Sequence, residues 1–125
     1  MNTPAFTQID SPSWPSGYPQ AIAVVTIQPE LFTKAFGLKF SEGHDNLDRY
    51  VAAAIRTPSG RTLGLLRHLG DPGPGTQVYA DSGDDFVGAL REFLDAFDLS
   101  VEDLSWMRDE ISARQLRLAE HRAHA

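Results

Sequence analysis

The segment Phe86-Val-Gly-Ala-Leu-Arg-Glu-Phe-Leu-Asp-Ala-Phe97 spaces its large apolar residues as an amphipathic α-helix does. Counted from Phe86, these residues stand at offsets of 0, 4, 7, 8 and 11, which places them on one side of a helix. Burying five such side chains contributes on the order of 10 kcal/mol before conformational entropy is counted. We therefore predict a long helix over 84–97 that covers one face of a β-sheet.

The residues on both sides of this helix carry the signals of helix starts. Ser82 and Asp85 have the spacing of a capping box, in which each side chain accepts a hydrogen bond from the backbone N–H of the other residue. Ser100 and Asp103 repeat this spacing, with leucines at the flanking positions of a hydrophobic staple. We expect this second box to begin another helix, which contains Trp106.

Three segments before the long helix have the composition of β-strands. Residues 47–57, 62–69 and 76–80 carry aliphatic side chains, and proline and glycine supply the turns between them. They predict an antiparallel three-stranded meander, although the alanines at 52–54 favour helix instead. Residues 21–27 are apolar on both faces and rich in β-branched side chains, which is typical of a strand inside a sheet.

The remaining segments complete an α+β fold. A short helix is expected from Pro29, because proline favours the first helical position, and Gly37 ends it. A short strand over 38–40 and a loop over 41–46 follow. We predict an antiparallel sheet of about four or five strands, with one long amphipathic helix packed on one face and a C-terminal helix. The predicted organisation is an irregular proline-rich arm (1–20) that packs over the domain or is free, a single α+β domain (21–111), and a frayed or projecting C-terminal helix (112–125).

Composition restricts the class of protein. A chain of 125 residues, of which 42% are hydrophobic, has the size of one domain with its own core. It has no cysteine, which excludes disulfides and thiolate metal sites. No signal peptide is visible, and the longest apolar run, at 21–25, is far shorter than the roughly 20 residues of a membrane span. We expect a cytoplasmic protein without a membrane partner.

Negative charge is concentrated in the second half of the chain. Residues 81–110 contain ten carboxylates and two arginines, a local charge of −8 within a total of −6, so the rest of the chain carries +2. On ordered helices this charge can steer and hold a cationic partner. The same acidity argues against a nucleic-acid partner, whose phosphates require clustered lysine and arginine. Acidity that serves only solubility is the simpler alternative.

The outward face of the long helix and the segment after it supply the candidate binding residues. Gly88 is unusual there, because a glycine inside a helix costs about 0.8–1 kcal/mol relative to alanine, and it would let another surface approach closely. A glycine that is merely tolerated is the alternative. An exposed tryptophan or tyrosine beside these acids would serve as an anchor, although burial in the core is the default for each. The candidate partner-binding residues are Asp84, Asp85, Gly88, Glu92, Asp95, Asp98, Glu102 and Asp103.

No catalytic or metal-binding motif is visible. The groups His44, Asp45 and Asp48, and His68 with Asp71, match no known metal-site spacing, and turn chemistry explains them. The serines lie at turn or cap positions, and no nucleophile elbow is present. The glycine-rich loop at 70–75 has no lysine, and its two prolines lack N–H donors for a phosphate. We therefore expect no cofactor, no metal and no enzymatic activity.

Three functional hypotheses remain open. The first is a non-enzymatic acidic binding protein that masks a basic protein partner, such as an immunity protein neutralising a toxin or a secretion chaperone. The second is a small structural or regulatory subunit that self-associates as a homodimer or docks into a larger complex, with contacts from the arm and from residues 112–125. The third is an enzyme whose two carboxylates, distant in sequence, meet in a cleft under the loop at 41–46.

Overall fold

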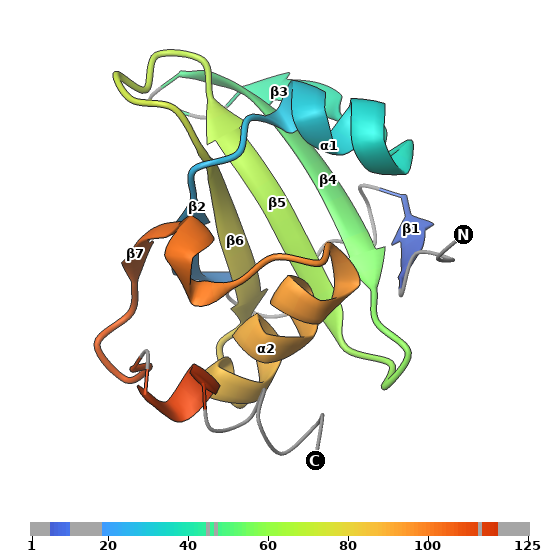
Figure 1. Ribbon diagram of the computed structural model, residues 1–125. Helices are drawn as coiled ribbons and strands as arrows, with labels where there is room; N and C mark the ends of the chain where they lie inside the picture. The colour runs from blue at the N-terminus through green and yellow to red at the C-terminus, as the bar shows by residue number, and fades with distance from the viewer. Residues whose placement is uncertain (1–5, 11–18, 45, 47, 113, 118–125) are drawn as a thin grey trace.

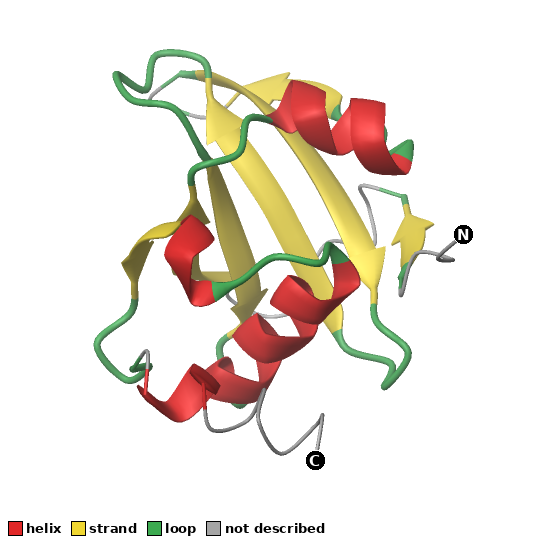
Figure 2. Ribbon diagram, viewed as in Figure 1, coloured by secondary structure: helices red, strands yellow, loops and turns green. Residues whose placement is uncertain are grey.

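In the computed structural model, residues 6–10, 19–44, 46, 48–112 and 114–117 are described. Within them, seven strands form one antiparallel sheet, and helices α1 and α2 lie on the same face of it (Figure 1, Figure 2). The α+β class is therefore confirmed, with more strands than the four or five predicted. The strands are β1 (Thr7–Ile9), β2 (Pro19–Val25), β3 (Ser41–His44), β4 (Arg49–Arg56), β5 (Thr62–His68), β6 (Thr76–Asp81) and β7 (Leu104–Met107). The helices are α1 (Pro29–Phe36), α2 (Phe86–Ala96) and the 3₁₀ turn η2 (Val101–Asp103).

The strands follow the order β1-β4-β5-β6-β2-β7, and β3 also pairs with β4. The predicted meander is present, since β4 pairs with β5 and β5 pairs with β6. β2 lies between β6 and β7, as its apolar composition predicts for an interior strand. β7 therefore forms one edge of the described sheet, at the left in Figure 1.

The opposite edge is shared by two short strands. β1 pairs with β4 from Arg56 to Ala54, and β3 pairs with β4 from Ala52 to Arg49. Both run antiparallel to β4, so they follow one another end to end along it and leave a gap at Ala53. Of the alanines that favoured helix, Ala52 and Ala54 thus lie where β4 is paired on both sides.

Two corrections concern strands. The sequence predicts a loop at 41–46, but Ser41–His44 form β3, and the strand predicted at 38–40 is absent. The polar side chains of β3 are mostly exposed, so no alternation of apolar residues indicates this strand. It exists because the backbone of β4 offers a partner, which composition does not reveal.

The helix predicted after Ser100 is also wrong. Its capping box is present, with Ser100 and Asp103 capping each other, but it closes only the single 3₁₀ turn η2. The chain then becomes β7, which pairs with the edge of β2. Sheet pairing here overrides a local helix signal. The box predicted at Ser82, by contrast, does not form: α2 begins after Asp85 without a side-chain cap.

An aromatic cluster joins both helices to the N-terminal strand. The ring centroid of Phe97 lies 4.8, 4.9, 5.0 and 5.1 Å from those of Phe6, Phe32, Phe36 and Phe93, respectively. Three of these contacts are edge-on or tilted beyond 50°, a favourable geometry for aromatic pairs. The helix predicted over 84–97 is present as the shorter α2, with its apolar side in the core, and it shares this face of the sheet with α1.

Both ends of the chain are only partly described. Phe6 packs on the aromatic cluster and residues 7–9 form β1, whereas the rest of the predicted arm at 1–5 and 11–18 lies outside the described residues. Residues 114–117 are helical, and Leu116 is fully buried in the core. The projecting helix predicted for 112–125 falls mostly on residues 113 and 118–125, which are not described.

Candidate functional site

Two of the predicted acids on α2 and the loop before it form an ion-pair cluster with Arg61. The Arg61 guanidinium lies with Nε 3.1 Å from Asp84 Oδ2 and Nη1 2.5 Å from Glu92 Oε2. The side chains are only 17–20% exposed. Ser59 Oγ donates a further hydrogen bond of 2.6 Å to Glu92 Oε1. These two carboxylates are therefore partly neutralised within the chain and tie the β4–β5 turn to α2.

Gly88 makes room for this cluster. A β-carbon at this position would lie 3.1 Å from Arg61 Nη1 and 2.5 Å from Asp85 Oδ2. The close approach that the sequence predicted for another surface is thus made by a side chain of the same chain. A partner contact at Gly88 stays a prediction, and the packing of Arg61 and Asp85 explains the glycine without it.

The protonation of Glu92 depends on the same contacts. Burial alone would raise the pKa of Glu92, but hydrogen bonds from Ser59 and Thr57 and the charges of Arg61 and Arg91 lower it below the ordinary value of 4.5. A carboxylate whose pKa is lowered by folding adds stability above its unfolded pKa, and this stability is lost as the pH falls through the folded value. Glu92 therefore stabilises the fold at neutral pH.

We expect Glu92→Gln to lower the free energy of unfolding at pH 7 by on the order of 1 kcal/mol, because an ionic hydrogen-bonded contact is replaced by a neutral one. The difference from wild type should shrink as the pH falls below 4.5. Urea unfolding between pH 7 and pH 3 measures both values. Glu42→Gln, on an exposed side chain of β3, is the control and should follow wild type. A difference that is independent of pH would contradict the ionic role of Glu92.

The other predicted acids have different surroundings. Asp95 Oδ2 lies 3.4 Å from Arg91 Nη1, and Glu102 Oε1 lies 2.7 Å from Arg117 Nη2. A hydrogen bond from Ser100 and the charge of Arg117 lower the pKa of Glu102. Asp103 caps η2 through Ser100. The remaining two, Asp85 and Asp98, are exposed and make no side-chain ion pair with another described residue.

A second acidic surface surrounds the edge strand β7. Trp106 is 46% exposed, and it pairs with Val24 of β2. The neighbouring Ala23 is fully buried in the core beneath the helices, so Val24 and Trp106 face away from them. Exposed carboxylates stand at both ends of the strand, at Glu102 before it and at 109–110 after it. We call Trp106, Glu102, Asp109 and Glu110 the β7 surface.

The sequence led to this surface only in part. Glu102 is one of the predicted binding residues, and Trp106 is an anchor candidate that the sequence predicts in a helix. Asp109 and Glu110 belong to the acidic segment but not to the predicted binding residues. Pairing with β2 puts them at the end of an edge strand, and only tertiary contacts decide that.

A small notch lies on the same face of the sheet, where β5 turns into β6. Its volume is about 230 Å³, and Val24 forms one wall. Arg67 fixes the turn by donating hydrogen bonds to Gly75 O at 2.9 Å and to Asp71 O at 3.3 Å. Since Val24 pairs with Trp106, the notch lies next to the β7 surface. Its lining residues are Val24, Arg67, Asp71, Pro72, Gly73, Pro74, Gly75 and Gln77.

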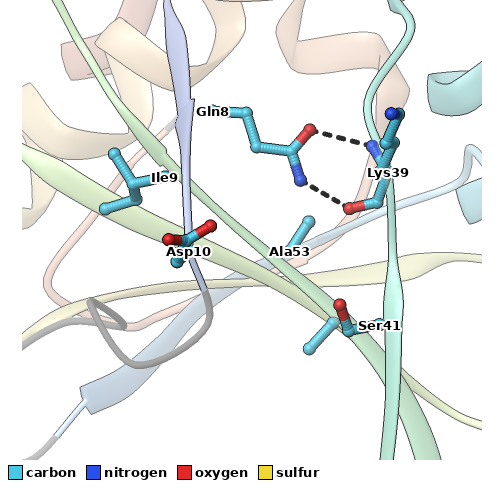
Figure 3. A pocket seen from close by; sticks show the side chains of 7 residues that line it. Gln8, Ile9, Asp10, Lys39, Ser41 and Ala53 are labelled. Atoms are coloured by element: carbon cyan, nitrogen blue, oxygen red, sulfur yellow. Dashed lines mark hydrogen bonds between the residues drawn. The ribbon is translucent and has the colours of Figure 1, made fainter.

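A larger pocket of about 510 Å³ lies at the opposite edge, where β1 and β3 meet along β4 (Figure 3). Gln8 spans it, because its amide accepts a hydrogen bond of 2.9 Å from Lys39 N and donates one to Lys39 O. The side-chain amide thus takes the place of a backbone peptide group. Asp10 and Ser41 add polar groups, but no described base lies within hydrogen-bonding distance of Ser41. The described lining of the pocket therefore holds no nucleophile–base pair.

The described residues offer no metal centre. Among them, no group of three or more histidine, cysteine, aspartate or glutamate side chains is placed to hold an ion. Asp48, a metal candidate in the sequence, accepts hydrogen bonds from the backbone N–H groups of Arg49 and Gly70 instead. Asp45 lies outside the described residues. None of the described helices has the length and apolar character needed to cross a bilayer.

Comparison of the chain with protein-family models, with curated proteins and with solved structures finds no match. No relative therefore assigns a role to the β7 surface, the notch or the pocket.

Proposed function

We propose that this protein is a non-enzymatic acidic binding protein that masks a basic protein partner through the β7 surface. The observation that carries the proposal is the 46% exposed indole of Trp106 on an edge strand whose two ends bear exposed carboxylates. Tryptophan is enriched among the residues that dominate binding energies. Carboxylates around it speed association with cationic proteins and disfavour acidic ones.

The charge near β7 supports a basic partner. Residues 99–112 contain four carboxylates and one arginine, Arg108, so this segment carries −3. Asp85 and Asp98, which are exposed and make no ion pair with another described residue, add to the attracting field. Asp84, Glu92 and Asp95 contribute less, because arginines of the chain already offset their charge. Glu102 and Glu110 are likewise paired with Arg117 and Arg108, so Asp109 is the carboxylate of the β7 surface without an ion pair to another described residue. By analogy with small acidic proteins, a toxin or a secretion client is the kind of basic partner we favour.

Self-association is the alternative, and the charges argue against it at this edge. If two β7 strands paired antiparallel, Glu102 and Asp103 of each copy would stand opposite residues 109–110 of the other. Like charges directly opposite destabilise a strand pair. A stable homodimer through β7 would therefore count against the proposal, and light scattering of the full chain detects it.

Peptides can be selected from a displayed random library on the immobilised protein. We expect the selected peptides to be basic and their binding to depend on charge and on Trp106. Their association rate should fall about tenfold or more between about 50 and 500 mM salt, because screening removes the steering. Trp106→Ala should weaken binding about tenfold or more through faster dissociation. Surface plasmon resonance gives both rates.

The charge reversal Asp109→Lys should slow association, whereas Glu42→Lys, at an exposed side chain of β3, changes the net charge equally and is the matched control. Selected peptides without enrichment of lysine and arginine, or equal rates at both salt concentrations, would refute the proposed function.

A further inference from the structure

We infer that the notch beside Trp106 receives one apolar side chain of the partner, within a segment whose flanking lysines or arginines meet the carboxylates of the β7 surface. This inference rests on the proposed function and adds the sequence pattern of the partner segment. It names an apolar anchor between cations, rather than a purely basic segment.

The walls of the notch select an apolar occupant. Val24, Pro72 and Pro74 present hydrocarbon, and Gly75 presents bare backbone. Arg67, Asp71 and Gln77 also line the notch, and the Arg67 guanidinium is engaged by the two carbonyls of the turn. The opposite charges of Arg67 and Asp71 offset each other, so the lining offers a cation no net attraction, and the hydrocarbon walls favour the partner's apolar group inside and its cations outside.

The exposed apolar side chains support the same occupant. Among the described residues, the exposed large hydrophobic side chains are Leu31, Leu69 and Trp106. Leu69, 47% exposed, begins the loop that walls the notch, and Trp106 is the cross-strand neighbour of Val24 on the other side. Directly opposite side chains on paired strands lie within contact distance, so Trp106 extends the apolar wall.

The size and rigidity of the notch fit a single anchor. At about 230 Å³ it is smaller than the roughly 300–1,000 Å³ of small-molecule sites, and it is open at the surface. Two prolines restrict the loop and Arg67 bonds it at two carbonyls, so little ordering is required on binding. A well-packed anchor surrounded by charged contacts is the usual arrangement of an interface hot spot.

The carboxylates decide what surrounds the anchor. Glu102 lies before β7, and Asp109 and Glu110 lie after it, so a segment that places an apolar residue beside Trp106 meets negative charge on both sides. Lysine or arginine next to the anchor is complementary to these groups. A second copy of this chain would bring carboxylates instead.

Three synthetic peptides test the inference on the full chain. The probe is acetyl-Lys-Lys-Phe-Lys-Lys-amide, one control replaces phenylalanine with alanine, and the other replaces each lysine with glutamine. In ¹⁵N-resolved NMR titrations, we expect the probe to shift the Trp106 indole and the amides of Gly75 and Gln77. The alanine peptide should bind about tenfold more weakly and leave Gly75 and Gln77 unshifted.

A pair of protein variants isolates the notch. Pro74→Lys puts a cation at its rim, and we expect it to weaken the probe about tenfold. Pro58→Lys is the matched control, because Pro58 is an exposed turn proline at the other end of β5, and it should bind as wild type does. Circular dichroism checks that both variants are folded.

The outcomes separate this inference from the proposed function. If the alanine peptide binds as tightly as the probe and both depend on salt, the notch has no anchor role, while the proposed function stands. If the glutamine peptide binds as tightly as the probe, the basic partner is refuted. If the probe shifts α2 rather than Trp106 and Gly75, or binds at no measurable concentration, the notch inference is overturned.

Discussion

Phe97→Ala is expected to lower the free energy of unfolding by about 3–5 kcal/mol, the range for removing a buried phenylalanine. The ring is 1% exposed and contacts four other phenylalanine rings, one from the N-terminal segment, two from α1 and one from α2. Its loss leaves a cavity where three elements meet, and their backbones cannot all move inward to fill it. Urea unfolding should show a lower midpoint with an unchanged slope.

Leu31→Ala is the matched control for this effect. Leu31 lies on α1 as part of the same helix layer, but its side chain is 52% exposed. Its truncation should change the free energy of unfolding by no more than about 0.5 kcal/mol, as is usual for surface positions. Equal losses for the two variants would mean that the aromatic cluster is not the centre of the core. A typical domain has only about 5–15 kcal/mol to lose, so Phe97→Ala also removes much of the margin against unfolding.

The elements that the sequence predicted correctly are those whose signals lie within their own residues. α2 has an apolar stripe of three turns, α1 has Pro29 at its start and Gly37 in the left-handed conformation at its end, and β4 to β6 are joined by strong turn sequences. Such signals are local, so a single sequence reveals them. The meander and the long helix together specify the α+β class.

The elements that it missed depend on a neighbour. β3 and β7 have four residues each and pair with edges of β4 and β2, and burial does not alternate along either of them. In η2, a capping box that is fully formed still did not start a helix, because the backbone after Asp103 gained more from pairing with β2. Edge strands of this kind are determined by the unpaired hydrogen-bonding groups of the sheet.

The candidate site follows the same division. Composition located the acidic segment, but not which acids the chain itself neutralises. Arg61 is distant in sequence from Asp84 and Glu92, and only the β4–β5 turn brings it over Gly88. The notch could not be predicted at all, because its walls come from β2 and from the turn at 70–75, which the sequence identified only as a hairpin connection.

Gly75→Ala, at a buried position in the turn between β5 and β6, is expected to lower the free energy of unfolding by about 2–3 kcal/mol. Gly75 has φ +135°, a conformation that other residues adopt only with strain of about 1–3 kcal/mol. A β-carbon there would also lie 2.6 Å from Val25 O, which is backbone of the interior strand β2. That oxygen cannot retreat without disturbing the pairing of β2. Urea unfolding measures the loss.

Gly73→Ala, two residues away in the same turn, provides the comparison. Gly73 has no positive φ and nothing within 4 Å of an added β-carbon. We expect it to be neutral or to stabilise by up to about 1 kcal/mol, because alanine restricts the unfolded chain. If Gly75→Ala proved as stable as Gly73→Ala, the close approach of this turn to β2 would be wrong, and with it the wall of the notch. If Gly75→Ala is destabilised but still folded, the displaced turn should no longer bind the phenylalanine of the lysine-rich probe peptide. The carboxylates at β7 should still attract the lysines of that peptide in a salt-dependent way.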